Sequence, residues 1–571
     1  MDKIKELYKN NTNIFNLLII ALVIVIGFLI FKDNYNGILT DKGRELLFPE
    51  AIANGKVLYK DILCIYFPFA FQINALFFKI FSPHLNVLIG LGLINTFVMG
   101  GLLYYIAKEF LSKNISLFFV VIYVMASAFN GTLFNSILPY STSFTYGITA
   151  FVAGVLCAVK YVKSENARYI RFAYLAGGFA FACKSEFALL FLVLALSSLF
   201  LKPQNIKNNI LNLLLYAVFP CLSCGILLYQ GVTIEHFMSA LDFMHRFFTT
   251  DAMIYHVTRT GALPSWEHLF MYLPAFFRLF IFITVTYFLY RITRHNKLFM
   301  IIAAFGCVYI ANFSLIDTHT LMLPILMSLF VIIRFKELLN NKPLLVLTIA
   351  SLFLNIRMFW ALNLNVYGML TAHILILSLL ILMFTYMRDF KGLSKDDFTD
   401  FITYLMFVYL LFYIAFDVVQ TTKNTTPLKT PKGTIYLPKA KSEALDFTLK
   451  YIKQYTKPEQ KILVLPEGMA INFFSDRQLD YSLPMIDRLY HDAMNEDEII
   501  EKLKQADYEL ILVVKGYGLT NFGKPYLYSE DNGIMEYIKD NYFADYKTEY
   551  TDGKNTNTMT FYIKPYSKEK S

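Results

Sequence analysis

Residues 40–81 read TDKGRELLFPEAIANGKVLYKDILCIYFPFAFQINALFFKIF, and they directly follow the first long hydrophobic run of the chain. In this stretch charged side chains stand between apolar segments. They include Asp41, Arg44, Glu45, Glu50, Lys56 and Asp61. A group of charged side chains this dense, directly beside a membrane span, suggests a function. We therefore expect a reaction or binding site in this stretch, and a scaffold around it that holds the stretch in place.

The composition is that of a polytopic membrane protein. Hydrophobic residues make up 56% of the chain, charged residues only 17%, and the mean hydropathy is +0.47. An ordinary soluble domain has about 25% charged residues. The net charge of +9 does not point to nucleic acid, because many of the basic residues fall in short loops between hydrophobic runs. We interpret that pattern as a signal of membrane topology and predict no nucleic-acid partner.

Hydrophobic runs of about 17 to 25 residues predict the membrane-spanning helices. About 13 are expected, near residues 14–31, 86–107, 114–131, 139–160, 170–183, 186–201, 210–230, 273–293, 298–314, 319–333, 343–359, 369–387 and 398–420. The segment 67–81 is apolar but short for a span, and we expect it to lie at the membrane interface. The fold class is thus an all-α polytopic membrane domain over residues 1–421.

The positions of Lys and Arg predict the orientation of this domain. Basic residues occupy alternate short loops, and all of these loops are cytoplasmic if the N-terminus is cytoplasmic. The opposite face then receives a large first outer loop over 32–85, the loop 231–272 and everything after residue 421. The first apolar run is too long for a removable signal peptide, so we expect it to stay as a span. This describes a multi-pass protein of the bacterial plasma (inner) membrane, with an extracytoplasmic C-terminal region.

Residues 422–571 have the pattern of a soluble, exported α/β domain. Amphipathic helices are predicted over 440–454 and 496–505, and buried strands over 461–465 and 510–514. We interpret the loop 231–272 as a partly ordered lid. Two of its histidines, His245 and His256, could bind a metal, but their spacing matches no motif of metal ligands, so no metal site is predicted there.

Three carboxylates of the first loop, Asp41, Glu45 and Asp61, are the candidate catalytic residues, and Arg44 is a candidate for substrate binding. In a helix, Asp41 and Glu45 would lie on one face with Arg44 close by. A carboxylate held against a membrane can act as a general base for an acceptor hydroxyl, and a neighbouring Arg can bind phosphate. The alternative is a solvated loop in which the charges only neutralise one another. Asp61 is a second carboxylate of the same loop and the next candidate base.

Two further places on the outer face carry candidate substrate-binding residues. Lys184 and Glu186 interrupt an apolar stretch, where they either bind a lipid phosphate or form a pair that marks a turn between two helices. Arg357 stands at the outer end of a predicted span and is a second phosphate candidate. Tyr367 follows it in the next outer turn.

Several of these motifs, in this order, resemble the GT-C membrane glycosyltransferases, the superfamily of the protein O-mannosyltransferases and the aminoarabinose transferases of lipid A. The similar residues are Asp41-Lys42-Gly43-Arg44-Glu45, Pro49, Gly55, Leu58-Tyr59-Lys60-Asp61, Leu138-Pro139-Tyr140-Ser141, Gly177-Gly178 before Lys184-Ser185-Glu186, Arg357 and Tyr367-Gly368. The resemblance implies a polyprenyl-phosphate sugar as donor and Asp41 as the base that activates the acceptor. The Asp-Glu pair of protein mannosyltransferases is replaced here by Asp41-Lys42, which weakens the case for a protein acceptor.

The function expected from these observations is glycosyl transfer, of a hexose or a pentose, in the synthesis of a cell-envelope glycan or glycolipid. The acceptor stays open between a glycan, a lipid and a protein. A lipid-phosphate sugar is already activated, and the sequence contains neither a G-x-G-x-x-G nor a G-x-x-x-x-G-K-[ST] motif in a strand-to-helix context. No cofactor is assigned, and a divalent metal at the leaving phosphate stays open. The alternatives are a transporter or lipid-linked-substrate flippase, and an assembly protein without activity.

Overall fold

The computed structural model describes most of the first half of the chain and of its C-terminal region. It covers residues 2–259 except 36–37, 40–41 and 130–134, scattered positions between 263 and 325, residues 326–356 and 368–386, a few positions within 399–408, and residues 425–565 except 516–519, 522–523, 526–531 and 553–554. Three of the predicted site residues, Asp41, Arg357 and Tyr367, lie outside these residues. The predicted boundary at residue 421 lies outside them as well, and the division into domains at that point stays a proposal.

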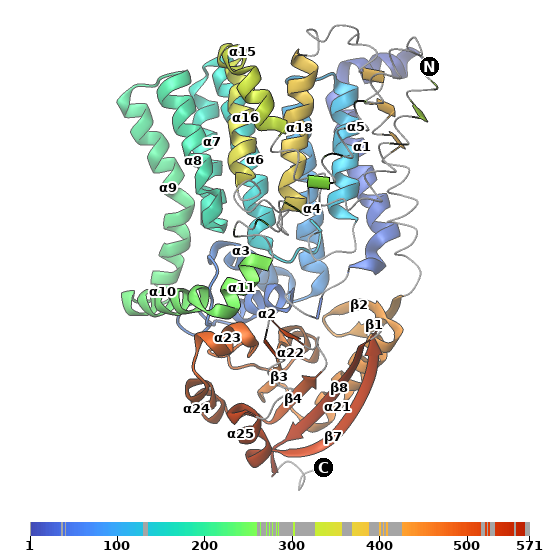
Figure 1. Cartoon of the computed structure of the whole chain (residues 1–571), viewed down its shortest axis with the longest axis vertical. Coiled ribbons are helices and arrows are strands. Elements are labelled where there is room, and N and C mark those ends of the chain that lie inside the picture. The colour runs from blue at the N-terminus through green and yellow to red at the C-terminus, as the bar shows by residue number, and fades with distance from the viewer. Residues whose placement is uncertain are drawn as a thin grey trace.

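The helices of the first half form an upright bundle (Figure 1). They are α1 (Asp2–Phe31), α4 (Leu85–Ala107), α5 (Lys113–Ala128), α6 (Thr142–Ser164), α7 (Ala167–Cys183), α8 (Leu189–Ala195), α9 (Ile206–Tyr229), α16 (Lys342–Leu354) and α18 (Gly368–Tyr386), with α15 (Phe335–Asn340) and the short turns η1 (Lys32–Asn34), η2 (Ser185–Ala188) and η3 (Leu196–Leu201) between them. Each of the predicted spans in this part of the chain corresponds to one of these elements, apart from 186–201, which is divided among η2, α8 and η3.

The chain is a multi-pass membrane protein. Among the described residues, four helical segments are long and apolar enough to cross a bilayer: Asn11–Asn34, Leu85–Ala107, Thr142–Ser164 and Ile206–Tyr229. The expected total of about 13 spans is not confirmed, because the runs 273–293, 298–314, 319–333 and 398–420 lie mostly outside the described residues.

Helix α6 lies inside the bundle and contacts α4, α7, α8 and α16. Small residues allow the helices to approach closely, as is usual between membrane helices. Gly178 of α7 shows this: a β-carbon at this position would lie 1.9 Å from the backbone oxygen of Tyr216 in α9. Helix α9, by contrast, lies at the edge of the bundle and has mostly exposed apolar side chains.

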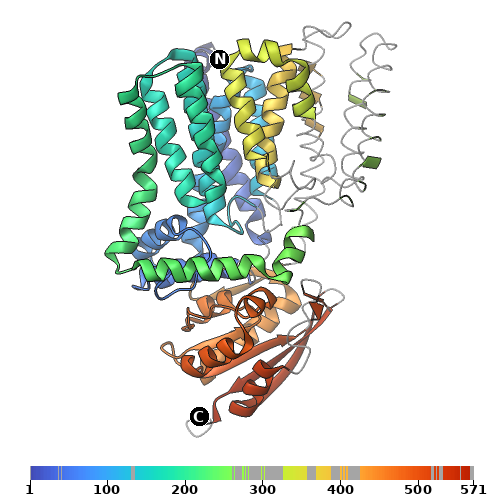
Figure 2. The same cartoon turned by 60° about the vertical axis from the view of Figure 1, so that its left-hand side comes forward.

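A layer of shorter helices lies across one end of the bundle, between the bundle and the C-terminal region (Figures 1 and 2). It contains α2 (Lys42–Ala53), α3 (Phe69–Phe81), α10 (Ile234–Thr249) and α11 (Asp251–Arg259). The N-terminal end of α1 is at the opposite end of the bundle. The predicted first outer loop and the C-terminal region therefore lie on the same side, and the N-terminus lies on the other side. The predicted lid, in its described part, consists of α10 and α11.

The C-terminal region is an α/β structure. Its four-stranded sheet has the order β3 (Ile462–Leu465), β4 (Leu510–Lys515), β8 (Asn555–Ile563), β7 (Phe543–Asp552). Strands β3 and β4 are parallel, with Ile462 opposite Leu510, and β8 and β7 are added antiparallel, with Leu510 opposite Ile563. The remaining elements are the hairpin β1 (Thr425–Thr430) and β2 (Gly433–Pro438), the short pair β5 (Thr520–Asn521) and β6 (Lys524–Pro525), and the helices α21 (Lys439–Tyr455), α22 (Met469–Ser475), α23 (Arg488–Ala493), α24 (Glu496–Ala506) and α25 (Gly533–Asn541).

The two helices and two strands predicted from the sequence of this region are confirmed as α21, α24, β3 and β4. All four residues of β3 are buried, which explains its continuous apolar sequence. The hairpins β1–β2 and β7–β8 were not predicted.

Candidate functional site

Helix α2 is the centre of the site and is buried along most of its length. All residues from Lys42 to Ala51 are buried, although four of them are charged. The helix contacts α3 on one side and α22 of the C-terminal region on another. Gly43 permits the second contact, because a β-carbon at that position would lie 2.5 Å from the backbone nitrogen of Ala470. The part of the first loop from Lys42 to Ala51 is thus enclosed between two parts of the protein and is not a solvated loop.

Arg44 and Glu45 form a buried ion pair. Arg44 Nε lies 3.4 Å from Glu45 Oε1, and each side chain is only 4% exposed. Arg44 Nη1 also donates a hydrogen bond of 2.7 Å to the hydroxyl of Tyr66, and its guanidinium lies 4.0 Å from the centre of the Tyr66 ring. Stacking and hydrogen bonds of this kind compensate a desolvated guanidinium, which would otherwise be strongly destabilising.

The carboxylate of Glu45 fixes the start of α6. Its Oε2 accepts hydrogen bonds from the Thr142 backbone nitrogen at 3.1 Å and from the Thr142 hydroxyl at 2.5 Å. A negative charge at this position is stabilised by the partial positive charge of a helix N-terminus. Both oxygens of Glu45 therefore have partners, Oε1 in Arg44 and Oε2 in Thr142.

The polar network continues from Thr142 into the bundle. Asn74 of α3 donates to the Thr142 hydroxyl at 3.0 Å, and the hydroxyl of Tyr146 donates to Asn74 Oδ1 at 2.8 Å. Helices α2, α3 and α6 are thereby joined by one chain of hydrogen bonds that ends at Glu45. Asn74 is recognisable in the sequence as a polar residue within an apolar segment, but no sequence signal indicates its partner.

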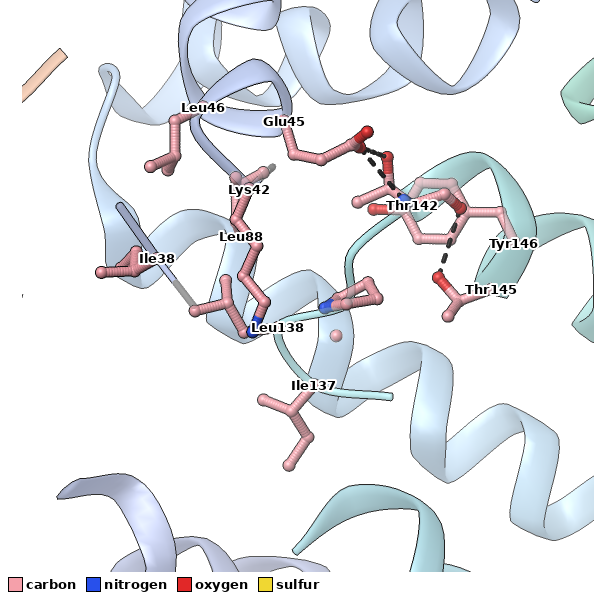
Figure 3. Close-up of a pocket in the computed structure, with 12 residues that line it drawn as sticks. Ile38, Lys42, Glu45, Leu46, Leu88, Ile137, Leu138, Thr142, Thr145 and Tyr146 are labelled. Atoms are coloured by element: carbon pink, nitrogen blue, oxygen red, sulfur yellow. Dashed lines mark hydrogen bonds between the residues drawn. The ribbon is translucent and has the colours of Figure 1, made fainter. Parts of the chain in front are cut away.

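Lys42 lies on the other side of Glu45 and was not predicted as a site residue. Its side chain is 1% exposed and extends along Leu88 towards Leu138 (Figure 3). It lines a cavity of about 10 Å³, room for about one water molecule, together with Ile38, Glu45, Leu46, Leu88, Gly92, Ile137, Leu138, Pro139, Thr142, Thr145 and Tyr146. Burial lowers the pKa of the Lys42 ammonium from 10.5 to about 7. The only signal in the sequence was its place directly after Asp41.

Asp61 closes a turn of its own loop. Its Oδ2 accepts a hydrogen bond of 2.8 Å from the backbone nitrogen of Val57. Tyr59, in the same turn, connects this loop to Tyr66, which accepts a hydrogen bond from Arg44. The Tyr59 hydroxyl donates a hydrogen bond of 2.7 Å to the backbone oxygen of Tyr66. Asp61 thus shapes the loop that supplies Tyr66 to Arg44, and it stays a candidate as a second carboxylate.

Lys184 and Glu186 lie at the same end of α6 as Glu45. Lys184 follows the last residue of α7, and its Nζ lies 3.2 Å from Glu186 Oε1 and 5.1 Å from the centre of the Phe144 ring. Phe144 is in the first turn of α6, two residues after Thr142. The structure therefore brings Arg44, Glu45, Lys184 and Glu186 to the start of one helix.

The C-terminal region contacts α2 through Lys432, in the turn of the β1–β2 hairpin. Lys432 Nζ lies 2.5 Å from Glu50 Oε1 in α2 and 2.7 Å from Asp476 Oδ1. The Lys432 backbone oxygen accepts a hydrogen bond of 2.9 Å from the Leu85 nitrogen at the start of α4. Burial raises the pKa of the Glu50 carboxyl, and the charge of Lys432 opposes that shift. This contact was not predicted from the sequence.

No three His, Cys, Asp or Glu side chains come together as a metal-binding group within the described ranges. We therefore name no metal ligands.

Comparison with known proteins gives matches among solved structures. No protein-family model matches the chain, and no curated protein sequence matches it. The crystal structure of ArnT from Cupriavidus metallidurans bound to undecaprenyl phosphate matches with a TM-score of 0.50 and 12% identity, over 96% of this chain and 97% of that one. The archaeal oligosaccharyltransferase AglB from Archaeoglobus fulgidus, in complex with an inhibitory peptide and a dolichol-phosphate, matches with a TM-score of 0.41 and 12% identity, over 89% of this chain and 70% of that one.

The likeness to ArnT extends over nearly the full length of both chains, so it includes the bundle, the layer of short helices and the C-terminal region. At 12% identity it is a likeness of fold. The chain shares its overall fold with that ArnT structure.

Proposed function

We propose that this protein is a membrane glycosyltransferase that moves a sugar from a polyprenyl-phosphate donor to an acceptor on the side of the membrane where its C-terminal region lies. The observation that carries the proposal is the buried Arg44–Glu45 pair fixed on the start of α6 beside Lys184. Clusters of desolvated charge are costly and mark functional sites. The undecaprenyl phosphate in the ArnT structure supports a lipid phosphate as the donor's leaving group.

The reaction needs a base, positive charge and a lipid-accessible position, and it needs no nucleotide-binding domain. Asp41 is the proposed base, and it takes the proton of an acceptor hydroxyl. The acceptor oxygen bonds to the anomeric carbon while the bond from that carbon to the phosphate oxygen breaks. The polyprenyl phosphate leaves with the electron pair, and nearby cations stabilise its charge.

The other candidates take supporting roles in this proposal. Arg44 and Lys184 supply positive charge near the start of α6, and Arg357 and Tyr367 are proposed to bind substrate. Because both oxygens of Glu45 already accept hydrogen bonds, we assign it a positioning role. Asp61 is the second candidate base.

The proposed orientation places the N-terminus in the cytoplasm and the C-terminal region outside. Reporter fusions at residues 165, 295 and 430 test it. We expect a cytoplasmic signal at 165 and 295 and an extracytoplasmic signal at 430. A cytoplasmic signal at 430 would contradict both the topology and the side of the membrane on which the reaction is proposed.

The chemical proposal is tested with the full-length protein in nanodiscs and a panel of radiolabelled polyprenyl-phosphate hexoses and pentoses. Loss of a general base lowers the rate about 10²- to 10⁴-fold, so Asp41→Asn should lower sugar transfer by that factor and leave donor binding nearly unchanged. Lys184→Ala and Arg357→Ala should instead weaken donor binding. Asp497→Asn, an exposed carboxylate of α24, is the matched control.

The competing function, a flippase for lipid-linked substrates, predicts a different result. Proteoliposomes that contain the protein would then move a labelled lipid-phosphate sugar between leaflets without breaking its sugar–phosphate bond. If Asp41→Asn transferred sugar at the wild-type rate, the base would be reassigned to Asp61. Full transfer by the Asp41, Glu45 and Asp61 variants alike would refute the first-loop mechanism.

A further inference from the structure

Helix α10 has a face that packs against the C-terminal region. Ala240, Phe243 and Phe247 are buried on it. The rings of Phe243 and Phe247 lie 5.6 and 5.5 Å from the ring of Tyr490 in α23. Arg246, close to this face, forms an ion pair with Glu498 at 3.3 Å. One side of α10 is therefore fixed to the C-terminal region by both apolar and charged contacts.

The opposite side of α10 is an exposed apolar stripe. It consists of Ile234, Met238, Leu241 and Phe248, which are 72%, 59%, 56% and 54% exposed. Their spacing of 4, 3 and 7 residues places them along one line of an α-helix, and His245 is the polar member of the same line. At about 100° per residue, this line is well over a quarter turn from both Phe243 and Arg246. The stripe therefore faces away from the C-terminal region.

The stripe begins five residues after the end of α9, whose apolar side chains are mostly exposed. That helix is one of the candidate spans and ends at Tyr229, and its Leu214, Leu222 and Leu228 are exposed. Gly231, with φ of 84°, lets the chain turn sharply, and α10 begins three residues later. Figures 1 and 2 show α10 running crosswise from the end of α9, with the bundle on one side and the C-terminal region on the other. A helix so placed presents its free side towards the bilayer.

From this geometry we infer that α10 lies in the headgroup layer of the leaflet nearest the C-terminal region, with the stripe inserted at the boundary of the acyl chains. The occupant of the stripe is the lipid bilayer, because the stripe begins five residues after a candidate membrane span whose apolar side chains are mostly exposed. Helices with one apolar and one polar face bind membranes in this orientation. Since the other side of α10 holds Tyr490 and Glu498, the helix attaches the C-terminal region to the membrane surface beside the proposed site.

The chain allows a direct test, because it contains only two tryptophans, Trp266 and Trp360. With both changed to Phe, Met238→Trp introduces a single fluorophore on the stripe. The full-length protein is reconstituted in nanodiscs that contain lipids brominated near the headgroup end of the acyl chains. We expect at least two-fold quenching by these lipids and little quenching by acrylamide in the water. Ser239→Trp is the matched control, one residue away on an exposed polar side, and its fluorescence should respond in the opposite way.

Leu241→Trp repeats the measurement if Met238→Trp does not give a monodisperse protein. Quenching of Met238→Trp by acrylamide as strong as that of Ser239→Trp would overturn the inference, because the stripe would then be in water. Shielding from both quenchers would also overturn it and would point to a second protein surface on the stripe. Sugar transfer is not part of this test, so its outcome is independent of the proposed function.

Discussion

Helix α2 buries the charged side chains of Lys42, Arg44 and Glu45, whereas the mainly apolar helix α9 leaves Leu214 and Leu228 exposed. Only 17% of the spanning window of α9 is buried, against 78% of that of α6. Helices α2 and α9 have different surroundings. The apolar side chains of α9 are mostly exposed at the surface of the bundle, so they gain little from protein packing. Protein encloses α2, so each of its charges needs a specific partner.

The contacts that stabilise α9 and those that stabilise α2 therefore differ in kind. Contacts around α9 are individually replaceable, because one apolar surface substitutes for another. Contacts around α2 are not replaceable, because removal of one partner leaves a desolvated charge. Substitutions in the two helices should therefore differ in size, and the following predictions test that expectation.

Replacement of Glu45 by Leu should have the largest effect on stability. It removes one carboxylate partner of the Arg44 guanidinium and the acceptor of Thr142 at the start of α6. Removal of one partner of a buried ion pair costs about 3–5 kcal/mol. Thermal unfolding of the purified protein in detergent measures the loss. The control is Glu443→Leu, since this α21 side chain is 67% exposed. An unchanged unfolding temperature for Glu45→Leu would show that α2 does not depend on the pair.

Lys432→Met should destabilise the contact between α2 and the C-terminal region by about 1–3 kcal/mol, because it leaves the Glu50 carboxylate without its partner. Burial raises the pKa of the Glu50 carboxyl, and the charge and hydrogen bond of Lys432 lower it. In the variant the lowering is lost, so the pKa of Glu50 should rise further. The folded variant then binds more protons than the unfolded chain, so its stability falls as the pH rises above about 4.5, the ordinary value for Glu.

Unfolding temperatures of Lys432→Met and wild type between pH 4 and pH 8 test this. The gap should widen with pH. Lys439→Met, which removes a 79% exposed partner of Glu443, should follow the wild type at every pH. A gap of constant size would mean that Lys432 acts through packing and not through the charge of Glu50.

Lys42→Met should change the way in which the stability of the protein depends on pH. The pKa of Lys42 is about 7 in the folded protein and 10.5 as its ordinary value. Between pH 7 and pH 10.5 the Lys42 side chain is mostly deprotonated in the folded protein and mostly protonated in the unfolded chain. The free energy of unfolding of the wild type therefore rises with pH over this range. The variant should lack that rise and be more stable than the wild type below pH 7. The exposed Lys429 gives the control, Lys429→Met, and identical pH profiles for wild type and Lys42→Met would refute the assignment.

Leu214→Ala should have the smallest effect, within about 0.5 kcal/mol, because the leucine is 62% exposed at the surface of the bundle. Leu190→Ala is the contrast. Leu190, in α8, is fully buried and lies against Gly154 of α6. Its truncation should therefore cost about 2–5 kcal/mol. Both are measured by thermal unfolding in nanodiscs. A loss at Leu214 as large as that at Leu190 would show that α9 has a protein partner in the membrane.

Much of the fold could be predicted because its signals are local. The run 86–107 became α4 almost residue for residue, and the amphipathic pattern at 440–454 became α21. Strands β7 and β8 were missed because charged residues such as Lys547 and Glu549 obscure the alternation of β7. The Asp552-Gly553 pair between them is a hairpin signal that could have been used.

The site was predictable only in part, for a different reason. The order of motifs named Arg44 and Glu45 as candidates, but some of the partners around them lie far away in sequence. Thr142 is 97 residues from Glu45, and Lys432 is 382 residues from Glu50. No local pattern encodes such pairs, since they arise only when α2 is enclosed by α6 and the β1–β2 hairpin. The burial of Lys42 has the same origin.

The ion pair between Glu50 and Lys432 also has a consequence for the order of synthesis. The ribosome adds about 5–20 residues each second, so Lys432 is made roughly 20 to 80 s after Glu50, given their separation of 382 residues. During that interval α2 has left the ribosome without the turn that later covers Glu50. Glu50 and the part of α2 around it therefore stay uncovered by the C-terminal region while the later helices are inserted. This part of the chain becomes enclosed only after Lys432 has been made.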